Sequence, residues 1–378
     1  MAKKILLLNY EFPPLGGGAA NATKYLLREF SKYKDLEITF VTSSINEFKI
    51  EKFSNNIEIH YLDIGKKGKN LHFQSNRELL SYTLKANKYA QKLKKKIDFD
   101  LVHAFFGIPC GHIAKKLNLP YIVSLRGSDV PFYNSRFKYY DKFFFKGLSK
   151  KVWKGAEFVV ANSKYLKDLA LQSCPEQDIK IIYNGVNLEE FKRNGNDLEN
   201  SLSKKFEILS VGRLIERKGL KYLLEALKDV KNVSLTIVGD GPLKENLISL
   251  AKDYNIDAKF LGDINHDEIP KYYKKADIFV LPSLSESMSN TILEAIAASL
   301  PIITTKTGPQ EIIKGNGFIV NIESPKEIKD AIIELRDNPL LKKNMGKRSF
   351  EIAKDLSWEK IALEYYKLYV ECFKKNDK

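Results

Sequence analysis

Short apolar runs alternate with helical patterns along almost the whole chain, and this alternation limits the possible folds more than any other feature. In the first half the apolar runs are KKILLLNY, LEITFVTSS, IEIHYL, DLVHAFF, PYIVSLRG and EFVVANS. Helical patterns separate several of them, as in ATKYLLREFSKY, NRELLSYTLKANKYAQKLKKK and CGHIAKKLN. Continuous apolar strands with helices between them are typical of parallel sheets that are covered on both faces. The sequence therefore predicts an α/β fold with doubly wound parallel sheets.

The second half of the chain repeats this plan. Its expected strands are KFEILSVG, VSLTIVGDG, AKFLGD, ADIFVLPS, LPIITTK and GFIV. The expected helices between them are GLKYLLEALKDV, LKENLISLAKDY, DEIPKYYKKA and NTILEAIAAS. A polar segment, Ile181 to Lys205, contains the turn dipeptide Asn184-Gly185 and interrupts the rhythm. Because 378 residues are ample for two domains, we predict one over residues 1–185 and another over 186–356.

Composition narrows the class of protein. Apolar residues make up 44% of the chain and charged residues 29%, as in a soluble globular protein, and no apolar run approaches the ~20 residues that span a bilayer. The opening MAKKILLLNYEFPP is interpreted as a first strand. The three cysteines, Cys110, Cys174 and Cys372, are widely spaced, which favours a reducing cytoplasmic location. The net charge of +15 would suit nucleic acid, an anionic membrane, anionic small molecules or simply solvated lysines.

Ligands of doubly wound sheets bind beyond the carboxyl ends of the strands, so the loops there are the candidate sites. In the first half, Gly16, Gly17 and Gly18 follow the first strand and precede a helix expected to open near Ala19 or Asn21. Glycines and a helix N-terminus can receive a phosphate. The loop matches neither the dinucleotide fingerprint nor a P-loop, and a turn without a ligand is the alternative interpretation.

Two loops of the second half could also receive an anion. In SVGRLIERKGL, Arg213 and Lys218 follow a strand and could clamp a diphosphate, although a pair of solvated charges is equally ordinary. In VGDGP, Gly239 and Gly241 favour a tight turn, and Pro242 suits the first position of a helix. That turn could line a nucleotide pocket or serve only to connect a strand with a helix.

The stretch LPSLSESMSNTILEAIAASLPIITT carries two carboxylates, Glu286 and Glu294. The run TILE fits a capping box, in which Glu294 would satisfy the start of its helix. Glu286 lies in a polar loop beside Ser289 and Asn290, whose backbone amides could face an anion. A phosphate would repel a carboxylate there, unless the carboxylate binds the neutral hydroxyl groups of the same ligand. A sugar joined to a nucleotide fits that arrangement.

The chain resembles glycosyltransferase family 4 in a set of motifs that occur in order over nearly its whole length. These motifs are the glycine loop after PP, VVANSKYL, IIYNGVNLEEF, GRLIERKGL, IVGDGP, FLGDI and ADIFVLPSLSESMSNTILEAIAASLPIITT. The resemblance implies a GT-B fold, with two Rossmann-like domains facing across a cleft, and a last helix, 357–378, that completes the first domain. It also implies transfer of a sugar from a nucleotide sugar with retention of configuration and without a bound metal or other cofactor.

The resemblance further implies roles for individual residues. Arg213 and Lys218 would hold the diphosphate and offset charge on the leaving group. Glu294 would bond the ribose hydroxyls, and Glu286 would contact the donor sugar. The other donor-binding positions that the motifs indicate are Gly17, Gly18, Gly212, Gly239, Gly241, Ser289 and Asn290. The expected donor is linked to UDP or GDP, and the expected acceptor is a cell-surface glycan or a lipid-linked glycan.

Three features of the first domain bear on the resemblance. Arg126 stands where many family members have a histidine; it could neutralise the departing diphosphate but cannot act as a neutral proton shuttle. His103 matches a histidine frequent in the family, and an ordinary buried, hydrogen-bonded histidine is the alternative. The D-x-D of Asp98 and Asp100 leads into a strand rather than following one, which is the wrong end to hold a nucleotide-bound metal.

The first domain also carries two basic clusters. The segment Phe132 to Gly155 interleaves lysine and arginine with aromatic residues, and AQKLKKK, residues 90–96, adds a second cluster. Since the first domain is the acceptor side of the family's fold, these clusters predict peripheral docking on the anionic inner face of a membrane. A core helix with solvated lysines is the alternative.

Other functions remain open at this point. Another GT-B enzyme, such as a sugar-nucleotide epimerase or a phosphorylase-like enzyme, would share the fold, although no motif for a cofactor lysine is evident. A nucleic-acid-binding protein is supported by charge alone, since no RRM, KH, helix-turn-helix or zinc-finger pattern occurs. We therefore expect no nucleic-acid partner. An inactive sensor of sugar nucleotides is disfavoured by the presence of both Glu286 and Glu294, although Arg126 leaves it open.

Overall fold

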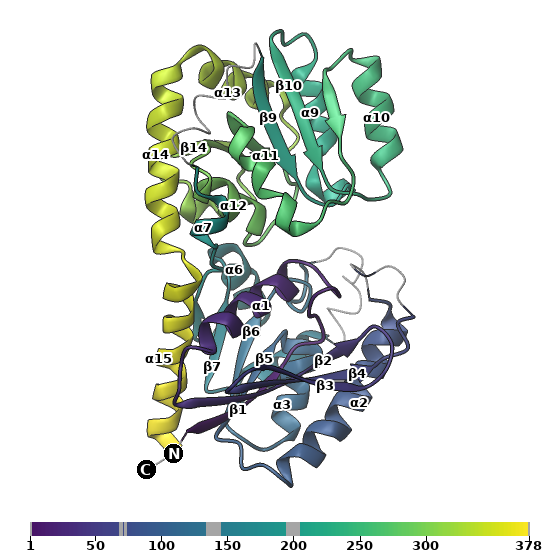
Figure 1. Cartoon of the computed structure of the whole chain (residues 1–378), viewed down its shortest axis with the longest axis vertical. Coiled ribbons are helices and arrows are strands. Elements are labelled where there is room, and N and C mark those ends of the chain that lie inside the picture. Colours follow the sequence, from purple (N-terminus) through teal and green to yellow (C-terminus); the bar gives the residue numbers. More distant parts are fainter. Residues whose placement is uncertain (1, 68–70, 72–73, 134–144, 194–204, 377–378) are drawn as a thin grey trace. The chain divides into compact units, whose positions relative to one another are not determined.

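The chain forms two compact α/β units (Figure 1). The computed structural model describes residues 2–67, 71, 74–133, 145–193 and 205–376. Unit 1 comprises Met1–Asn184 together with Trp358–Lys378, and unit 2 comprises Gly185–Ser357. The chain therefore passes between the units twice, after Asn184 and again after Ser357.

In the residues that the structure describes, unit 1 has an eight-stranded sheet in the order β3-β4-β2-β1-β5-β6-β7-β8. Its strands are β1 (Lys3–Leu8), β2 (Leu36–Ser44), β3 (Lys49–Ser54), β4 (Ile57–Asp63), β5 (Leu101–Phe105), β6 (Tyr121–Leu125), β7 (Phe158–Ala161) and β8 (Ile179–Ile181). The pairings are parallel except that of the edge strand β3, which runs antiparallel to β4. The expected parallel sheet is confirmed, and the two edge strands β3 and β8 are additions to it.

The helices of unit 1 include one from the far end of the chain. They are α1 (Gly18–Phe30), α2 (Asn76–Lys94), α3 (His112–Lys116), α5 (Lys146–Trp153), α6 (Lys164–Ser173) and α15 (Trp358–Asn376). Helix α15 packs against α1 and β5 (Figure 1). The rings of Tyr25 and Trp358 stack with their centroids 5.5 Å apart. The last helix is thus part of the core of unit 1.

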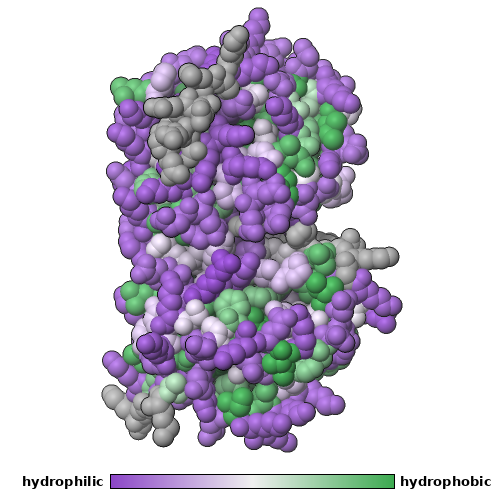
Figure 2. All heavy atoms as spheres, in the orientation of Figure 1, coloured by the Kyte–Doolittle hydropathy of each residue, from purple (hydrophilic) through white to green (hydrophobic). Residues whose placement is uncertain are grey.

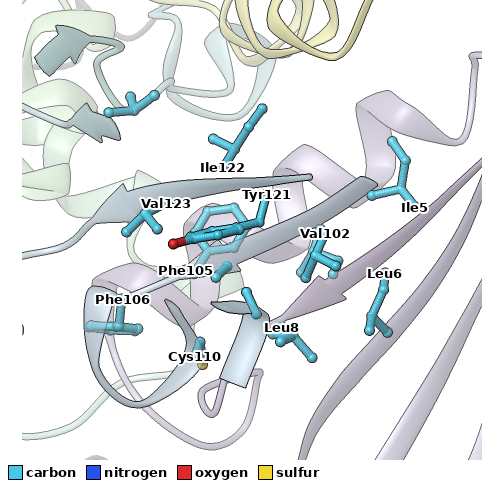
Figure 3. Packing of buried hydrophobic residues seen from close by; sticks show 14 of the residues in the cluster. Ile5, Leu6, Leu8, Val102, Phe105, Phe106, Cys110, Tyr121, Ile122 and Val123 are labelled. Carbon is cyan, nitrogen blue, oxygen red and sulfur yellow. The ribbon is translucent and has the colours of Figure 1, made fainter. Parts of the chain in front are cut away.

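The core of unit 1 explains why its strands are apolar without interruption. Ile5, Leu6 and Leu8 of β1 have no exposed surface, although neighbouring residues of a strand point to opposite faces. Figure 3 shows this packing around Val102 and Phe105 of β5. Both faces of the sheet are therefore buried, as the sequence pattern indicates.

Unit 2 has a six-stranded sheet in its described residues, in the order β11-β10-β9-β12-β13-β14, and all of these pairings are parallel. Its strands are β9 (Phe206–Val211), β10 (Val233–Val238), β11 (Ala258–Phe260), β12 (Ile278–Leu281), β13 (Ile302–Thr305) and β14 (Gly317–Val320). Each corresponds to an apolar run identified in the sequence.

Helices cover both faces of the second sheet. They are α7 (Leu188–Phe191), α9 (Leu220–Leu227), α10 (Lys244–Asp253), α11 (Pro270–Lys275), α12 (Asn290–Ala297), α13 (Pro325–Asp337) and α14 (Pro339–Asp355). Ile278 and Val280 of β12 join a hydrophobic cluster with α9, α10 and α13. Phe279, between them, faces the other way and stacks on Tyr273 of α11. Successive residues of one strand thus anchor helices on opposite faces.

Each sheet reverses its winding direction at one place. In unit 2, β9 pairs with both β10 and β12, and the chain builds outward from β9 to β11 and then from β12 to β14. In unit 1 the reversal lies between β1 and β5. The carboxyl ends of the two strands at such a reversal border a crevice, which is the usual ligand site of these folds.

The surface is mostly hydrophilic on the face seen in Figure 2, with hydrophobic residues in small patches. Among the described residues of unit 1, the exposed large hydrophobic side chains are Phe48, Ile50, Leu80, Leu84 and Leu363. Within the described residues, no helix combines the length and the apolar character needed to cross a bilayer.

Candidate functional site

The loops after β9 and β10 are packed backbone against backbone. Gly239 has a φ of +129°, and a Cβ atom at this position would lie 2.1 Å from the carbonyl oxygen of Gly212. At Gly241 a Cβ atom would lie 2.5 Å from the carbonyl oxygen of Leu214. Both contacts are too short for any side chain, so the glycines of the VGDGP turn are required by the packing of the two loops. Their structural role is to shape this end of the sheet.

Helix α10 begins later than its sequence suggests. Its first residue is Lys244, preceded by Leu243 as the N-cap. Pro242 therefore lies in the turn before the helix, and the expectation that it occupies the first helical position is wrong. The turn is longer because the amide of Leu243 donates to the carbonyl of Leu214, which holds this segment against the β9 loop.

Two charged residues of the candidate site meet at the reversal between β9 and β12. Lys218 ends a short 3-10 turn, Glu216–Lys218, after β9, and its Nζ forms an ion pair with Oε2 of Glu286 in the loop after β12. The side chains are only 12% and 8% exposed. The hydroxyl of Ser283 lies 3.4 Å from the same carboxylate oxygen. The pair joins the loops that follow the two central strands.

The electrostatics of this pair keep Glu286 ionised. Burial raises the pKa of its carboxyl group, but the positive charges of Lys218 and Arg217 outweigh burial, so the pKa lies below its ordinary value. The side chain of Arg213, on the same loop after β9, is exposed and forms no ion pair among the described residues. The site therefore combines a neutralised buried pair with an exposed cation.

Threonines from the next strand hold the Glu286 loop in place. The hydroxyls of Thr305 and Thr307 both donate to the carbonyl oxygen of Ser283, at 2.5 and 2.9 Å. The hydroxyl of Thr304 donates to the carbonyl of Leu281 at 3.1 Å. The sequence analysis missed these residues, although the polar run TTKT at the carboxyl end of an apolar strand was the available signal.

The second carboxylate, Glu294, is held by a buried tyrosine. The hydroxyl of Tyr273, on α11, donates to Oε2 of Glu294 at 2.7 Å and lies 3.2 Å from the carbonyl oxygen of Thr291. Tyr273 has no exposed surface. Burial, and then the nearby charge of Glu294, raises the pKa of this phenol well above its ordinary value, so it remains a hydrogen-bond donor. Nothing in the lysine-rich sequence around Tyr273 indicated this role.

The capping box expected at TILE is absent. Helix α12 begins at Asn290 with Ser289 as its N-cap, and the Ser289 side chain caps no backbone amide. Thr291 is already inside the helix, and its hydroxyl lies 2.9 Å from that of Ser289. Because the helix starts earlier than the motif requires, Glu294 lies one turn in, where Tyr273 bonds it. The capping interpretation of Glu294 is therefore wrong.

In unit 2 the structure thus gathers most of the expected donor-binding residues at one end of the sheet. Gly212 and Arg213 directly follow β9, and Lys218 forms its ion pair with Glu286. Asn290 and Glu294 lie on α12, the helix that follows the β12 loop. Ser289 immediately precedes that helix. These positions lie on the loops at the reversal of the sheet, where a ligand is expected.

In unit 1 the glycine loop contains a carboxylate of its own. Helix α1 begins at Gly18, with Gly17 as its N-cap. The amide of Gly17 donates to Oε2 of Glu11 at 3.4 Å, and Glu11 also lies against Gly16. The predicted anion position at this helix start is therefore bordered by a negative side chain, which the sequence analysis did not consider.

His103 has the surroundings of a structural histidine. It is completely buried, and its ring nitrogens lie 2.6 Å from the hydroxyl of Tyr369 and 2.8 Å from that of Ser124. Burial, aided by the charge of Arg126, holds its pKa well below the ordinary value. These surroundings agree with the alternative of an ordinary buried, hydrogen-bonded histidine, and the catalytic role of His103 stays a prediction.

Arg126 is engaged within unit 1. Its guanidinium donates to Oδ1 of Asn184 at 2.7 Å and to the hydroxyl of Tyr365 at 3.4 Å, and it lies 4.4 Å from the ring centroid of Phe105. Asp129, which is also buried, accepts the amide of Arg126. The arginine thus links the end of β6 with α15 and with the last residue before the chain leaves the unit.

The acidic D-x-D motif has a structural explanation. Asp100 directly precedes β5, its Oδ2 accepts the backbone amide of Lys4, and its Oδ1 pairs with Nζ of Lys3 at 3.2 Å. It therefore connects the amino ends of β1 and β5, as its place before a strand suggested. Within the described residues, no group of three or more His, Cys, Asp or Glu could hold a metal ion.

The aromatic and basic segment is only partly described, because residues 134–144 lie outside the described residues. In the described part, Val152 and Trp153 of α5 are completely buried in the core of unit 1. The buried side chains of α5 agree with the alternative of a core helix, and docking of this segment on a membrane stays a prediction.

Comparisons with known proteins identify the class. The Glycosyltransferase Family 4 description matches residues 16–190, and the Glycosyl transferases group 1 description matches residues 194–351. The chain therefore belongs to the glycosyltransferases of family 4, or group 1, type. Together with the motifs of unit 2, this makes it a transferase that uses a nucleotide-sugar donor.

One relative is similar along almost the full length of the chain, and another over part of it. An uncharacterized glycosyltransferase of Methanocaldococcus jannaschii, MJ1178, is 28% identical and the match covers 97% of this chain and 98% of the relative. A Campylobacter jejuni relative is named N-acetylgalactosamine-N,N'-diacetylbacillosaminyl-diphospho-undecaprenol 4-alpha-N-acetylgalactosaminyltransferase. It is 30% identical over 59% of this chain and 62% of its own length.

Solved structures show the fold. The sucrose-phosphate synthase of Thermosynechococcus elongatus superposes with a TM-score of 0.86 at 20% identity, covering 99% of this chain and 100% of that one. Anabaena HepE in complex with UDP and glucose gives a TM-score of 0.74 at 20% identity, covering 97% and 99%. The chain has the GT-B fold, as its motifs predicted.

Proposed function

We propose that this protein is a retaining glycosyltransferase that transfers a sugar from a UDP- or GDP-linked donor to a cell-surface glycan or lipid-linked acceptor. The observation that carries the proposal is the cluster at the reversal of the second sheet. There Lys218 and Glu286 are paired beside Arg213, and Glu294 is held on the adjoining helix. Retention of configuration is proposed on the family resemblance.

The diphosphate of the donor would be bound by the cations of the β9 loop. Arg213 is exposed and can offer its planar fork to two phosphate oxygens. Lys218 would turn from Glu286 toward the diphosphate, which is a stronger counter-charge than one carboxylate. These two positive groups would offset the charge that develops on the leaving nucleotide, so no metal cofactor is needed in this scheme.

The two carboxylates would bind the neutral parts of the donor. Glu286 is ionised and therefore accepts hydrogen bonds from sugar hydroxyls rather than donating a proton. Glu294 lies one turn along α12 and would accept the ribose hydroxyls. In this scheme the carboxylates bind the hydroxyl groups of the donor and the cations bind its phosphates. This division explains why acidic residues occur in a phosphate-binding loop.

UDP is the first donor nucleotide to test, because HepE, one of the structures similar to this chain over nearly its whole length, is described in complex with UDP and glucose. GDP remains the second candidate. The name of the Campylobacter jejuni relative, which includes diphospho-undecaprenol, supports a lipid-linked acceptor and a polysaccharide or lipopolysaccharide pathway for this protein.

A lipid-linked acceptor would place the protein in the cytoplasm, peripherally on the inner face of the membrane. Leu80 and Leu84 lie one turn apart on α2 and are exposed, with the exposed cations Arg77, Lys85 and Lys88 on the same helix. Such a helix can insert apolar side chains between lipids while its lysines meet anionic headgroups. Flotation with anionic vesicles tests this, and a protein that remains at the bottom of the gradient contradicts it.

Binding of nucleotides tests the donor site directly. We expect UDP or GDP, but not ADP, to raise the melting temperature of the wild type in a concentration-dependent way. Arg213→Ala and Glu294→Ala should each abolish most of this shift. Arg348→Ala, which removes an exposed arginine of α14, is the matched control and should respond like the wild type. Variants that respond like the wild type would refute the site.

A further inference from the structure

A buried tyrosine hydroxyl contacts helix α12 at two residues, one in its first turn and one at the start of the next. Tyr273 donates to the carboxylate of Glu294 at 2.7 Å and lies 3.2 Å from the carbonyl of Thr291. Its side chain is fully buried, whereas Glu294 is partly exposed. The tyrosine therefore approaches the carboxylate from the interior, and part of Glu294 remains exposed to solvent.

We propose that Tyr273 is a positioning residue for the donor: its hydroxyl fixes the Glu294 carboxylate in the orientation that receives the ribose hydroxyls. The inference rests on the proposed function, in which Glu294 binds the ribose. An ionised carboxylate has about four acceptor positions, so a single carboxylate can accept hydrogen bonds from a tyrosine and from two neighbouring ribose hydroxyls together.

The tyrosine itself is rigidly held. Its ring stacks on Phe279 of β12, with centroids 5.7 Å apart, and meets Phe191 of α7 edge-on at 5.4 Å. Arg193 donates to the carbonyl of Tyr273 at 2.9 Å and also to that of Ala276, which fixes the last turn of α11. A ring confined on these sides keeps its hydroxyl in one place, as a positioning role requires.

The hydrogen bond has the character of an orienting bond. A bond to a charged acceptor is shorter and stronger than one between neutral groups, and 2.7 Å is within that range. Without it, the flexible glutamate side chain would populate several rotamers, and binding would have to select one of them. Packing alone does not explain the hydroxyl, because phenylalanine would fill the same space between Phe279 and Phe191.

Tyr273→Phe tests the inference, with binding measured by calorimetry. The probes are UDP and GDP, each beside its 2′,3′-dideoxy analogue, which lacks the hydroxyls that Glu294 would bind. We expect the wild type to prefer the ribose form by about tenfold or more. Tyr273→Phe should lose most of that preference, while its affinity for the dideoxy analogue changes by less than about twofold.

Two further variants make the result specific. Tyr82→Phe is the matched control, because Tyr82 is also fully buried and its hydroxyl donates to the carbonyl of Val41 in unit 1. It should keep the wild-type preference for ribose. Glu294→Ala should lose the preference completely. Equal melting temperatures of the two phenylalanine variants, within about 4 °C, would show that both are folded.

The outcomes separate the inference from the function on which it rests. If Glu294→Ala loses the ribose preference and Tyr273→Phe keeps it, the positioning role is refuted and the donor site stands. If neither variant loses it, Glu294 does not bind ribose and both proposals fail. If Tyr273→Phe weakens both forms of the nucleotide equally, the tyrosine only packs, and the inference is overturned.

A second substitution covers the case in which Tyr273→Phe does not fold. Incorporation of 3-fluorotyrosine at position 273 keeps the ring and the hydroxyl and makes that hydroxyl a stronger donor. The preference for ribose should then rise or remain complete. A preference that falls despite an intact fold would contradict the positioning role.

Discussion

Removing the positive partner of the buried ion pair should reverse the pH dependence of stability. In Lys218→Met, Glu286 is left only 8% exposed without its principal counter-charge. Breaking a buried pair from one side costs about 3 kcal/mol, at the low end of the usual range because Arg217 remains nearby. We therefore expect Lys218→Met to be destabilised by about 3 kcal/mol at pH 7.

The sign of the pH effect follows from the direction of the Glu286 pKa. In the wild type this pKa is lowered below its ordinary value of 4.5, so the stabilisation is present above that value and is lost as the pH falls through the folded pKa. In Lys218→Met, burial dominates and raises the pKa of Glu286. The free energy of unfolding of the variant should therefore increase as the pH falls toward 5. Over the same range the wild type should retain the stabilisation that its ion pair provides.

Urea unfolding followed by circular dichroism between pH 5 and 8 measures this difference. Both tryptophans, Trp153 and Trp358, belong to unit 1, so tryptophan fluorescence would not report on the pair. The double variant Lys218→Met/Glu286→Gln should regain most of the loss, because no charge remains buried. The reasoning would be refuted if Lys218→Met lost the same free energy of unfolding at pH 5 and at pH 8. It would also be refuted if the loss in the double variant equalled the sum of the losses in the two single variants.

Three other substitutions address the loops and the core. Gly239→Ala should cost about 3 kcal/mol or more in thermal unfolding, since its Cβ atom would lie 2.1 Å from the carbonyl oxygen of Gly212; a fully stable variant would contradict the packing argument. Thr305→Val removes one of the hydrogen bonds to the carbonyl oxygen of Ser283 and should weaken nucleotide binding about threefold. Calorimetry measures this change, and an unchanged affinity would contradict the prediction. His103→Phe should lower the melting temperature and leave nucleotide binding intact. Because the pKa of His103 is depressed in the folded protein, the wild type should lose stability as the pH falls below about 6.5, and this loss should be smaller in the variant.

The interior of both sheets could be predicted from the sequence, whereas their edges could not. Strands such as β5 and β12 are short apolar runs because both faces are buried. Strand β3, KIEKFS, is exposed and charged, and β8 has only three residues, so neither has the apolar pattern of a central strand. Helix α13 was also missed, although Ser324 before Pro325 is a common helix start and its side chain does cap the helix.

The residue types of the candidate site could be predicted, but not their pairings. Lys218 and Glu286 were both identified, yet they lie 68 residues apart in sequence, and only the parallel pairing of β9 with β12 brings their loops together. Tyr273 carried no signal, because a tyrosine among lysines resembles an exposed helix face. The assignment of His103 also required the fold, since one of its partners, Tyr369, comes from the last helix.

The placement of α15 has a consequence for the order of folding during synthesis. Unit 2 is one continuous segment, residues 185–357, and can complete its core while the chain is still being made. Unit 1 begins first but lacks Trp358, Tyr365 and Tyr369 until the last helix leaves the ribosome. Until then the imidazole of His103 lacks a hydrogen-bond partner 266 residues further along the chain. Of these two units, the one that is translated earlier is therefore finished later, and its incomplete apolar face is the part of the nascent chain that a chaperone would have to protect.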